Sequence, residues 1–437
     1  MIRTVREFSI DNPKEFKEKL FIWSTQFDTI VWLDSNNHDQ TYTSFDCALA
    51  LEEFTSIKTD YHNAFDKLKE YQSYTKDYIF GYISYDVKND VEQLSSNNFD
   101  GLNFSDLYFF QPQKLIFIKE STVEFHYLQM IDDELEEDFE EIYETNPNSL
   151  SLNKPQSSEN IKIKLRIHKD EYHEKVSKVL EHIHRGDIYE ANFCQEFYIE
   201  NSTINPYKIY KHLNEISEPP FATFFKNNEQ YVISATPERY IKKVGNKIVS
   251  QPIKGTAKRL INKIEDDKIA FDLARDEKER SENIMIVDLV RNDLSRTAKK
   301  GTVKVEELCK VYSFKQVHQM ISTITSETAP NIHPVDIIKD TFPMGSMTGA
   351  PKISAMEIIE KLEETKRGLY SGTIGYFTPD NDFDFNVIIR SILYDQNKQY
   401  ISYSVGGAIT AKSIPEKEYE ECLLKAKAMK YVLLNSK

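Results

Sequence analysis

Short runs of β-branched and aromatic residues recur along the whole chain, often two runs in succession. They lie at Ile30–Leu33, Tyr78–Tyr85, Lys114–Ile118, Glu190–Glu200, Tyr231–Ala235, Tyr370–Tyr376, Phe385–Tyr394 and Tyr400–Val405. Helical segments lie among these runs, but helices and strands do not alternate strictly, as they would in a parallel sheet with helical crossovers. The pattern therefore predicts an α+β fold in which helices flank antiparallel sheets.

Amphipathic helices are indicated by apolar residues at helical spacing. They are predicted at Phe54–Tyr74, Asp170–Arg185, Glu265–Arg296, Pro351–Leu362 and Pro415–Leu434. Gly186 is a natural stop for the second of these. In the last one, we expect Tyr419, Leu423, Ala426 and Leu433 to face inward.

A polar stretch separates two regions of the chain. Asp132–Glu141 is strongly acidic, and the following residues, 145–160, are rich in Ser, Asn and Pro. Such a composition is typical of an exposed connection. We therefore expect an N-terminal region over residues 1–150 and a second region over residues 160–437.

Charge and cysteine content exclude several classes of protein. The 437 residues carry a formal net charge of −15, which argues against a nucleic-acid or membrane-surface partner. The four cysteines stand far apart and form no CxxC pair, so we expect a reducing compartment and neither disulfides nor a zinc site. No apolar run is long enough for a signal peptide or a membrane span. These features predict a soluble, cytoplasmic protein.

Two pairs of glutamates have the chemistry of a divalent-cation site. Glu279 and Glu282 are three residues apart, as are Glu418 and Glu421. Each pair lies on one face of a helix, and two such helices in opposition offer oxygen ligands to a hard cation. The same spacing occurs at other glutamates of the chain, where a solvated helix face explains it equally well.

Four further segments carry groups suited to binding an anion or to nucleophilic attack. Lys254 stands between Pro and Gly residues in QPIKGT, at a turn or strand end; it is either a nucleophile with a lowered pKa or an ordinary surface lysine. FPMGSMTGAPK (342–352) opens a helix, whose N-terminal amides favour anions, although a plain helix start is also compatible. VGGAI (405–409) either presents backbone amides to a carboxylate or forms a simple turn. Arg390, in an apolar run, requires a buried partner, either a carboxylate or a ligand anion.

Taken in order, these segments resemble the chorismate-utilising enzymes, and within that family the aminodeoxychorismate synthases. The resemblance rests on GDIYEANFCQEF (186–197), SATPERY (234–240), QPIKGT (251–256), ERSENIMIVDLVRNDL (279–294), VHQMIST (317–323), FPMGSMTGAPK (342–352), SGTIGYF (371–377), VIIRS (387–391), VGGAI (405–409) and EYEECLLK (418–425). It implies two orthogonally packed antiparallel sheets flanked by helices, and a magnesium-dependent enzyme that binds chorismate.

The resemblance also assigns roles to individual residues. Glu282 and Glu421 are expected to ligate Mg²⁺, with Glu279 and Glu418 acting through water. The remaining substrate-binding residues divide between two parts of chorismate. The enolpyruvyl carboxylate is expected to meet Arg390, Tyr376, Gly406 and Gly407, and the ring end to meet Gly255, Thr256, Ser346 and Lys425. Gln319 is also expected to bind the substrate. Glu238, in TPERY, matches the family's general acid.

The choice among family members depends on Lys254. Anthranilate synthases resemble this chain but have Ala at this position, whereas aminodeoxychorismate synthases have Lys, which adds covalently to ring carbon 2 before ammonia adds at carbon 4. Isochorismate and salicylate synthases use a lysine at the position of Glu190, so they rank below anthranilate synthase as alternatives. A diverged paralogue that binds chorismate without turning it over is a further alternative, but all the metal carboxylates are present.

The resemblance further implies a separate glutamine amidotransferase subunit as the source of ammonia. No glutaminase segment surrounds any of the four cysteines. Four positions depart from the usual family pattern: Glu190 and Glu196 replace Gln and Arg, Gln319 replaces His, and Met344 replaces Gly or Ala. In the N-terminal region, WLDS (32–35) lies where relatives have a Ser-containing tryptophan pocket.

Overall fold

Twenty strands, all paired antiparallel, form one hydrogen-bonded network in the part of the chain that the computed structural model describes, residues 3–38, 41–147, 161–315, 317–329 and 331–435. The strands are β1 Arg3–Ser9, β2 Thr29–Asp34, β3 Cys47–Thr59, β4 Ile79–Ile83, β5 Leu107–Lys119, β6 Thr122–Leu128, β7 Lys164–Leu165, β8 Glu190–Ile199, β9 Phe221–Asn227, β10 Gln230–Thr236, β11 Arg239–Val244, β12 Lys247–Gln251, β13 Ile253–Lys258, β14 Lys304–Ser313, β15 Val317–Glu327, β16 Gly349–Ala350, β17 Thr373–Phe377, β18 Phe383–Val387, β19 Ser391–Asp395 and β20 Tyr400–Thr410.

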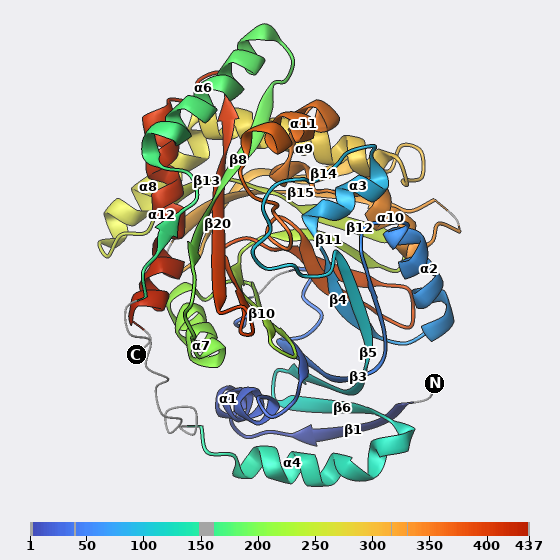
Figure 1. Ribbon diagram of the computed structural model, residues 1–437. Helices are drawn as coiled ribbons and strands as arrows, with labels where there is room; N and C mark the ends of the chain where they lie inside the picture. Colours follow the sequence, from blue (N-terminus) through green and yellow to red (C-terminus); the bar gives the residue numbers. More distant parts are fainter. Residues whose placement is uncertain (1–2, 39–40, 148–160, 316, 330, 436–437) are drawn as a thin grey trace.

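Helices flank this network (Figure 1). The α-helices are α1 Pro13–Ser24, α2 Ala64–Thr75, α3 Lys88–Val91, α4 Leu135–Glu144, α6 Lys169–Arg185, α7 Pro206–Ser217, α8 Lys263–Arg275, α9 Glu277–Ser295, α10 Pro334–Thr341, α11 Lys352–Leu362 and α12 Pro415–Asn435, and the short 3₁₀ turns are η1 Tyr85–Val87, η2 Gln129–Glu134 and η3 Gly345–Met347. Antiparallel strands with helices outside them confirm the predicted α+β class.

Strand β5 joins the two halves of the network. One edge pairs with β3 along its length, while the other edge pairs first with β4 and then with β6. One branch runs from β3 through β2, β9, β10, β19 and β20 to β8, and the other runs from β4 through β17, β18, β11 and β12 to β15. The two expected sheets are therefore continuous through β5. Their far ends, β8–β20 and β13–β15, are the ones that carry the site described below.

Two long helices cover these far ends. Helix α12 packs on β20, α6 and α7, and α9 packs on β13, β14 and β15. In Figure 1, α12 is the red helix beside β20. The largest apolar cluster lies under α1, α6, α7 and α12, and a second cluster lies under α2, α9 and α10. Each helix is therefore held by its apolar face, which leaves its polar face free for the site.

Three predicted helices differ from those in the structure. Residues 47–59 form β3, and the helix predicted at Phe54–Tyr74 begins only at Ala64, because β3 gains a partner in β5 along its whole length. The predicted helix Glu265–Arg296 divides at Asp276, whose side chain caps α9 by accepting from the Glu279 amide. In α12, Leu423 is exposed and Cys422 takes the inward position, which corrects that part of the predicted face.

The predicted domain boundary falls within residues 148–160, outside the described residues. Strands from the two sides of it share the network, since β2 pairs with β9 and β4 pairs with β17. The division into two regions remains a prediction. Within the described ranges, no helix is both long enough and apolar enough to span a membrane.

Candidate active site

Four carboxylates from α9 and α12 gather beside the ends of β13 and β20. Burial raises the pKa of Glu282 to about 7, and it also raises the pKa values of Glu279 and Glu418. Burial acts on Glu421 as well, but the Lys425 ammonium 2.6 Å away lowers the pKa of that carboxyl overall. The charges of the two helices interact, because Glu421 contributes to the raised pKa of Glu279. The sequence-predicted pairs are therefore brought together.

One oxygen of these four carboxylates, Glu282 Oε1, is buried without a hydrogen-bond partner among the described residues. Lys278 Nζ lies 3.7 Å from it, too far for a hydrogen bond. A cation placed among the carboxylates would compensate their negative charge. No group of three or more His, Cys, Asp or Glu side chains stands preassembled to hold a metal in the described ranges. Mg²⁺ needs only one or two protein carboxylates, because waters and substrate oxygens complete its shell, so the donor set fits it.

Lys254 reaches across from β13 to β8. Its Nζ lies 3.1 Å from Glu190 Oε1, and the two side chains are only 12% and 2% exposed. A bulge between Ile253 and Thr256 interrupts the pairing of β13 with β15, and Gly255 has a φ of +90°, a conformation that favours glycine. The irregular backbone places Lys254 on a bend of its strand. Burial opposes the charge of Lys254, but Glu190, Glu282 and Glu421 outweigh it and raise the pKa of the ammonium.

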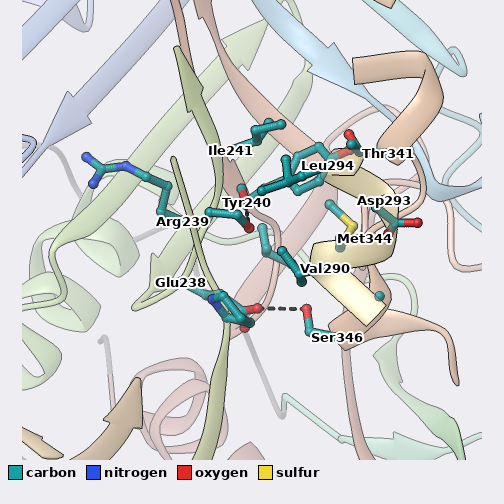
Figure 2. A pocket seen from close by; sticks show the side chains of 14 residues that line it. Glu238, Arg239, Tyr240, Ile241, Val290, Asp293, Leu294, Thr341, Met344 and Ser346 are labelled. Carbon is teal, nitrogen blue, oxygen red and sulfur yellow. Dashed lines mark hydrogen bonds between the residues drawn. The ribbon is translucent and has the colours of Figure 1, made fainter. Parts of the chain in front are cut away.

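Glu238 lies between β10 and β11, with only 3% of its surface exposed. Ser346 Oγ, from η3, donates a 2.7 Å hydrogen bond to Glu238 Oε1 (Figure 2). Burial raises the pKa of Glu238 to about 7, against the opposing effects of Ser346 and Lys254. The carboxyl is therefore protonated in a substantial fraction of molecules at neutral pH, as a general acid requires.

A cavity of about 20 Å³ lies behind Glu238, lined also by Val290 and Met344. This volume suits one water molecule. Figure 2 shows Met344 at the cavity and the Arg239 guanidinium pointing away from it. Met344, one of the four departures from the family pattern, thus helps to fill the space beside the acid.

The paired glycines of β20 lie beside α12. A Cβ on Gly406 would stand 2.4 Å from Cys194 Sγ on β8, so no side chain fits there. A Cβ on Gly407 would stand 3.5 Å from the carboxylates of Glu418 and Glu421. Lys425 Nζ donates to the Gly406 carbonyl at 2.8 Å. The sequence-predicted Gly406, Gly407 and Lys425 are therefore neighbours of the carboxylates.

Arg390 lies in the break between β18 and β19 and has a φ of +52°. Its guanidinium donates a 3.0 Å hydrogen bond to the Lys425 carbonyl and interacts electrostatically with Tyr370 and Glu421. No carboxylate forms a salt bridge with it among the residues described. Arg390 therefore lies beside Lys425 and Glu421, among the predicted site residues.

The ring-end residues flank Lys254. Thr256 and Gln319 stand opposite each other in the pairing of β13 with β15. The buried Gln319 Oε1 has no hydrogen-bond partner in the described part of the chain. A Cβ added at Gly255 would stand 3.2 Å from Glu279 Oε2. The ring-end residues therefore adjoin the carboxylates of α9.

Tyr376 does not lie with these residues. It lines a separate cavity of about 60 Å³ together with Phe45, Arg239 and Asp384, and its ring packs against Phe45 and Phe80. Because strand side chains alternate between faces, the position of Tyr376 in β17 directs it to that cavity. Tyr370 is the tyrosine near Arg390, and it was not predicted.

The second cavity also bears on the expected tryptophan-type pocket. Leu33, Asp34 and Ser35 of the WLDS segment line it, together with Phe221. The cavity therefore lies where the sequence resemblance places such a pocket. Binding of tryptophan remains a prediction.

Two residues that depart from the family pattern, Glu190 and Glu196, form ion pairs in the structure. Glu190 holds Lys254, and Glu196 holds the Arg166 guanidinium at 3.0 Å and accepts from the Tyr400 hydroxyl. Pattern reasoning missed Glu190 as a site residue because its partner is 64 positions away in sequence. The only sequence signal was the departure from the family pattern at the start of this strand, where Glu190 replaces Gln.

Residues 28–431 match the chorismate binding enzyme family. The chain belongs to this family. An anthranilate synthase component I-like protein from Synechocystis sp. is 34% identical over 350 residues, 80% of this chain and 71% of that protein. Aminodeoxychorismate synthase component 1 from Escherichia coli is 40% identical over 253 residues, 58% of this chain and 55% of that protein. The family assignment identifies a chorismate-utilising enzyme.

Solved structures of the family share the fold. Anthranilate synthase component I from Streptococcus pneumoniae superposes with a TM-score of 0.77 at 25% identity, covering 90% of this chain and 94% of that one. The menaquinone-specific isochorismate synthase from Escherichia coli gives a TM-score of 0.73 at 15% identity, covering 99% and 95%. The match spans about half the length of two curated aminodeoxychorismate synthases, 55% of the Escherichia coli protein and 56% of the Bacillus subtilis protein.

Proposed function

We propose that this protein is aminodeoxychorismate synthase component I, which converts chorismate and ammonia into 4-amino-4-deoxychorismate. The observation that carries the proposal is the Lys254 amine, buried opposite Glu190 and within electrostatic reach of Glu238, Glu282 and Glu421. The identity of 40% and 36% to two aminodeoxychorismate synthases supports the same reading. The product is a precursor of 4-aminobenzoate, and hence of folate.

The proposed chemistry uses Lys254 as the nucleophile and Glu238 as the acid. The amine adds to ring carbon 2, the two double bonds shift, and the hydroxyl at carbon 4 leaves as water with the proton of Glu238. Ammonia then adds at carbon 4, the double bonds shift back, and Lys254 leaves carbon 2. Two displacements exchange the hydroxyl for an amino group at the same carbon.

Mg²⁺ is the proposed cofactor, with Glu282 and Glu421 as ligands and Glu279 and Glu418 acting through water. When bound, the ion offsets the charge of these carboxylates and receives the ring carboxylate of chorismate. Arg390 and the amides beside Gly406 and Gly407 are the proposed partners of the enolpyruvyl carboxylate. Tyr376 is not part of this proposal.

Ammonia is proposed to come from a glutamine amidotransferase subunit. The reaction consumes ammonia, and no cysteine of this chain stands in a glutaminase segment. The four cysteines are buried, so none presents an accessible nucleophile in this fold. The proposed role of this chain is the chorismate chemistry.

Anthranilate synthase component I is the second candidate. An anthranilate synthase component I-like protein from Synechocystis sp. and anthranilate synthase component 1 from Aquifex aeolicus each align over 80% of this chain. The aminodeoxychorismate synthases from Escherichia coli and Bacillus subtilis align over 58% and 60%. Lys254 argues against it, because direct addition of ammonia at carbon 2 has no use for a lysine there.

One incubation distinguishes the two candidates. Purified protein is mixed with chorismate, Mg²⁺ and an ammonium salt at mildly alkaline pH, and the products are separated by chromatography. We expect aminodeoxychorismate. Anthranilate as the sole product would overturn the proposal while leaving the chorismate site intact, and isochorismate would assign the protein to water addition.

A further inference from the structure

Glu190 and Lys254 form a buried ion pair that links the two far ends of the sheet network. Glu190 begins β8 and pairs in register with Thr410 of β20 and Ala350 of β16, so its backbone is fixed on both edges. Its Oε1 lies 3.1 Å from Lys254 Nζ, and its Oε2 is buried without a hydrogen-bond partner in the described ranges. A buried carboxylate oxygen without a partner is unfavourable and calls for an explanation, of which a catalytic role is one.

The proposed reaction gives the pair a use. An ammonium group has no lone pair and cannot attack carbon 2, so Lys254 must lose a proton first. The surrounding carboxylates hold that proton firmly: Glu190 on β8, Glu238 beside β11, Glu279 and Glu282 on α9, and Glu421 on α12. Only Glu190 lies within hydrogen-bond distance of the amine among the described residues. The acceptor therefore has to be Glu190 or a water molecule.

We propose that Glu190 is a further catalytic residue, which accepts the proton of Lys254 before the amine attacks and returns it after the amine leaves. This inference rests on the proposed function. In the first half, the proton moves from Nζ to the carboxylate, the freed lone pair bonds to carbon 2, and the bond from carbon 4 to the hydroxyl breaks with the proton of Glu238, which releases water.

The second half restores every group. Ammonia bonds to carbon 4 and the bond between carbon 2 and Nζ breaks, leaving a neutral amine. Glu190 returns its proton to that amine, and the Glu238 carboxylate takes the surplus proton of the new ammonium group at carbon 4. The net change is the exchange of a hydroxyl for an amino group with one water released, so atoms and charges balance.

Sharing one proton between two groups has a measurable consequence. The ion pair and the neutral acid–amine pair contain the same number of protons, so their ratio does not change with pH. Without Glu190, the reactive amine forms only by losing a proton to solvent. Its fraction then falls about tenfold for each unit of pH below the pKa of the ammonium.

The test compares pH profiles of kcat/KM for chorismate in the wild type and in Glu190→Gln. The amide keeps the shape of the side chain and removes the acceptor. The ratio of variant to wild type is taken at about pH 6 and below, about one unit or more under the pKa of Glu238, so that this acid stays mostly protonated in both proteins. We expect this ratio to fall about tenfold per pH unit as the solution becomes more acidic.

Two control variants accompany it. Glu190→Asp keeps a carboxylate near the amine, so its ratio to wild type is expected to stay constant with pH even if its turnover is lower. Glu196→Gln removes the other buried glutamate of β8, which pairs with Arg166 and not with Lys254. Even if Glu196→Gln lowers the amount of folded protein, the ratio of its kcat/KM to the wild-type value is also expected to be independent of pH.

A second readout follows the covalent step itself. With chorismate and no ammonia, rapid quenching and intact-mass measurement at about pH 6 should show an adduct with the mass of chorismate less one water in the wild type. It should form much more slowly in Glu190→Gln and never in Lys254→Ala. Parallel pH profiles together with equal adduct rates in wild type and Glu190→Gln would overturn the role of Glu190.

Failure of the proposed function gives a different result. A wild-type protein that forms neither the adduct nor aminodeoxychorismate refutes the proposed function, and the role of Glu190 falls with it. A wild type that forms both, beside a Glu190→Gln variant that matches it at every pH, refutes only the role of Glu190.

Discussion

Replacing Glu238 by Gln should make the protein more stable at alkaline pH and far less active. The structure gives the magnitude, because burial raises the pKa of this carboxyl from 4.5 to about 7 in the folded protein. At 1.36 kcal/mol per pH unit, the shift corresponds to about 3 kcal/mol.

The sign follows from proton linkage. Between pH 4.5 and 7 the folded protein keeps a proton that the unfolded chain has released, so the free energy of unfolding falls as pH rises through this window. Above about pH 7 the folded protein has released this proton as well, and the free energy of unfolding has fallen by its full amount. Gln cannot titrate, and its amide oxygen still accepts from Ser346. Glu238→Gln should therefore match the wild type near pH 4.5 and exceed it by about 3 kcal/mol at pH 8.

Urea unfolding followed by the fluorescence of Trp23 and Trp32 measures this difference at about pH 5 and pH 8. Glu137→Gln, which removes an exposed carboxylate of α4, is the matched control and should show no such dependence on pH. Turnover of Glu238→Gln should fall about 10²–10⁴-fold at about pH 6, where the wild-type acid is protonated, because protonation of the leaving hydroxyl is lost. An equal stability difference at both pH values, or near-native turnover, would refute the reasoning.

The other predictions concern three further residues. Ser346→Ala removes a hydrogen bond that favours the Glu238 carboxylate, so the alkaline limb of the kcat/KM profile should move up by about one pH unit; a limb that stays in place or moves down contradicts this. Lys254→Ala should abolish aminodeoxychorismate formation while leaving the fold intact, and Lys254→Arg should be equally inactive, since guanidinium stays protonated; native turnover in the Arg variant would rule out the covalent step. Glu421→Gln should raise both the Mg²⁺ concentration for half-maximal turnover and the KM for chorismate, and a chelator should abolish turnover of the wild type; an unchanged Mg²⁺ titration would remove Glu421 from the ligand set.

The amino-acid sequence by itself determined the elements whose signals are local. Helix α6 ends where Gly186 adopts a φ of +88°, and α12 covers the predicted range, because helical periodicity and capping depend on residues a few positions apart. Collinear motifs also placed Lys254, Glu238 and the carboxylates of α9 and α12 in one family pattern.

The tertiary structure alone decided which side chains meet. Tyr370 and Tyr376 are the two ends of one predicted strand, and only the pairing of β17 with β4 and β18 places Tyr376 at the second cavity. Glu190 and Lys254 meet across strands from opposite ends of the network. The raised pKa of Glu238 depends on burial by segments far away in sequence. Burial and long-range pairing arise from the whole chain, so no local pattern encodes them.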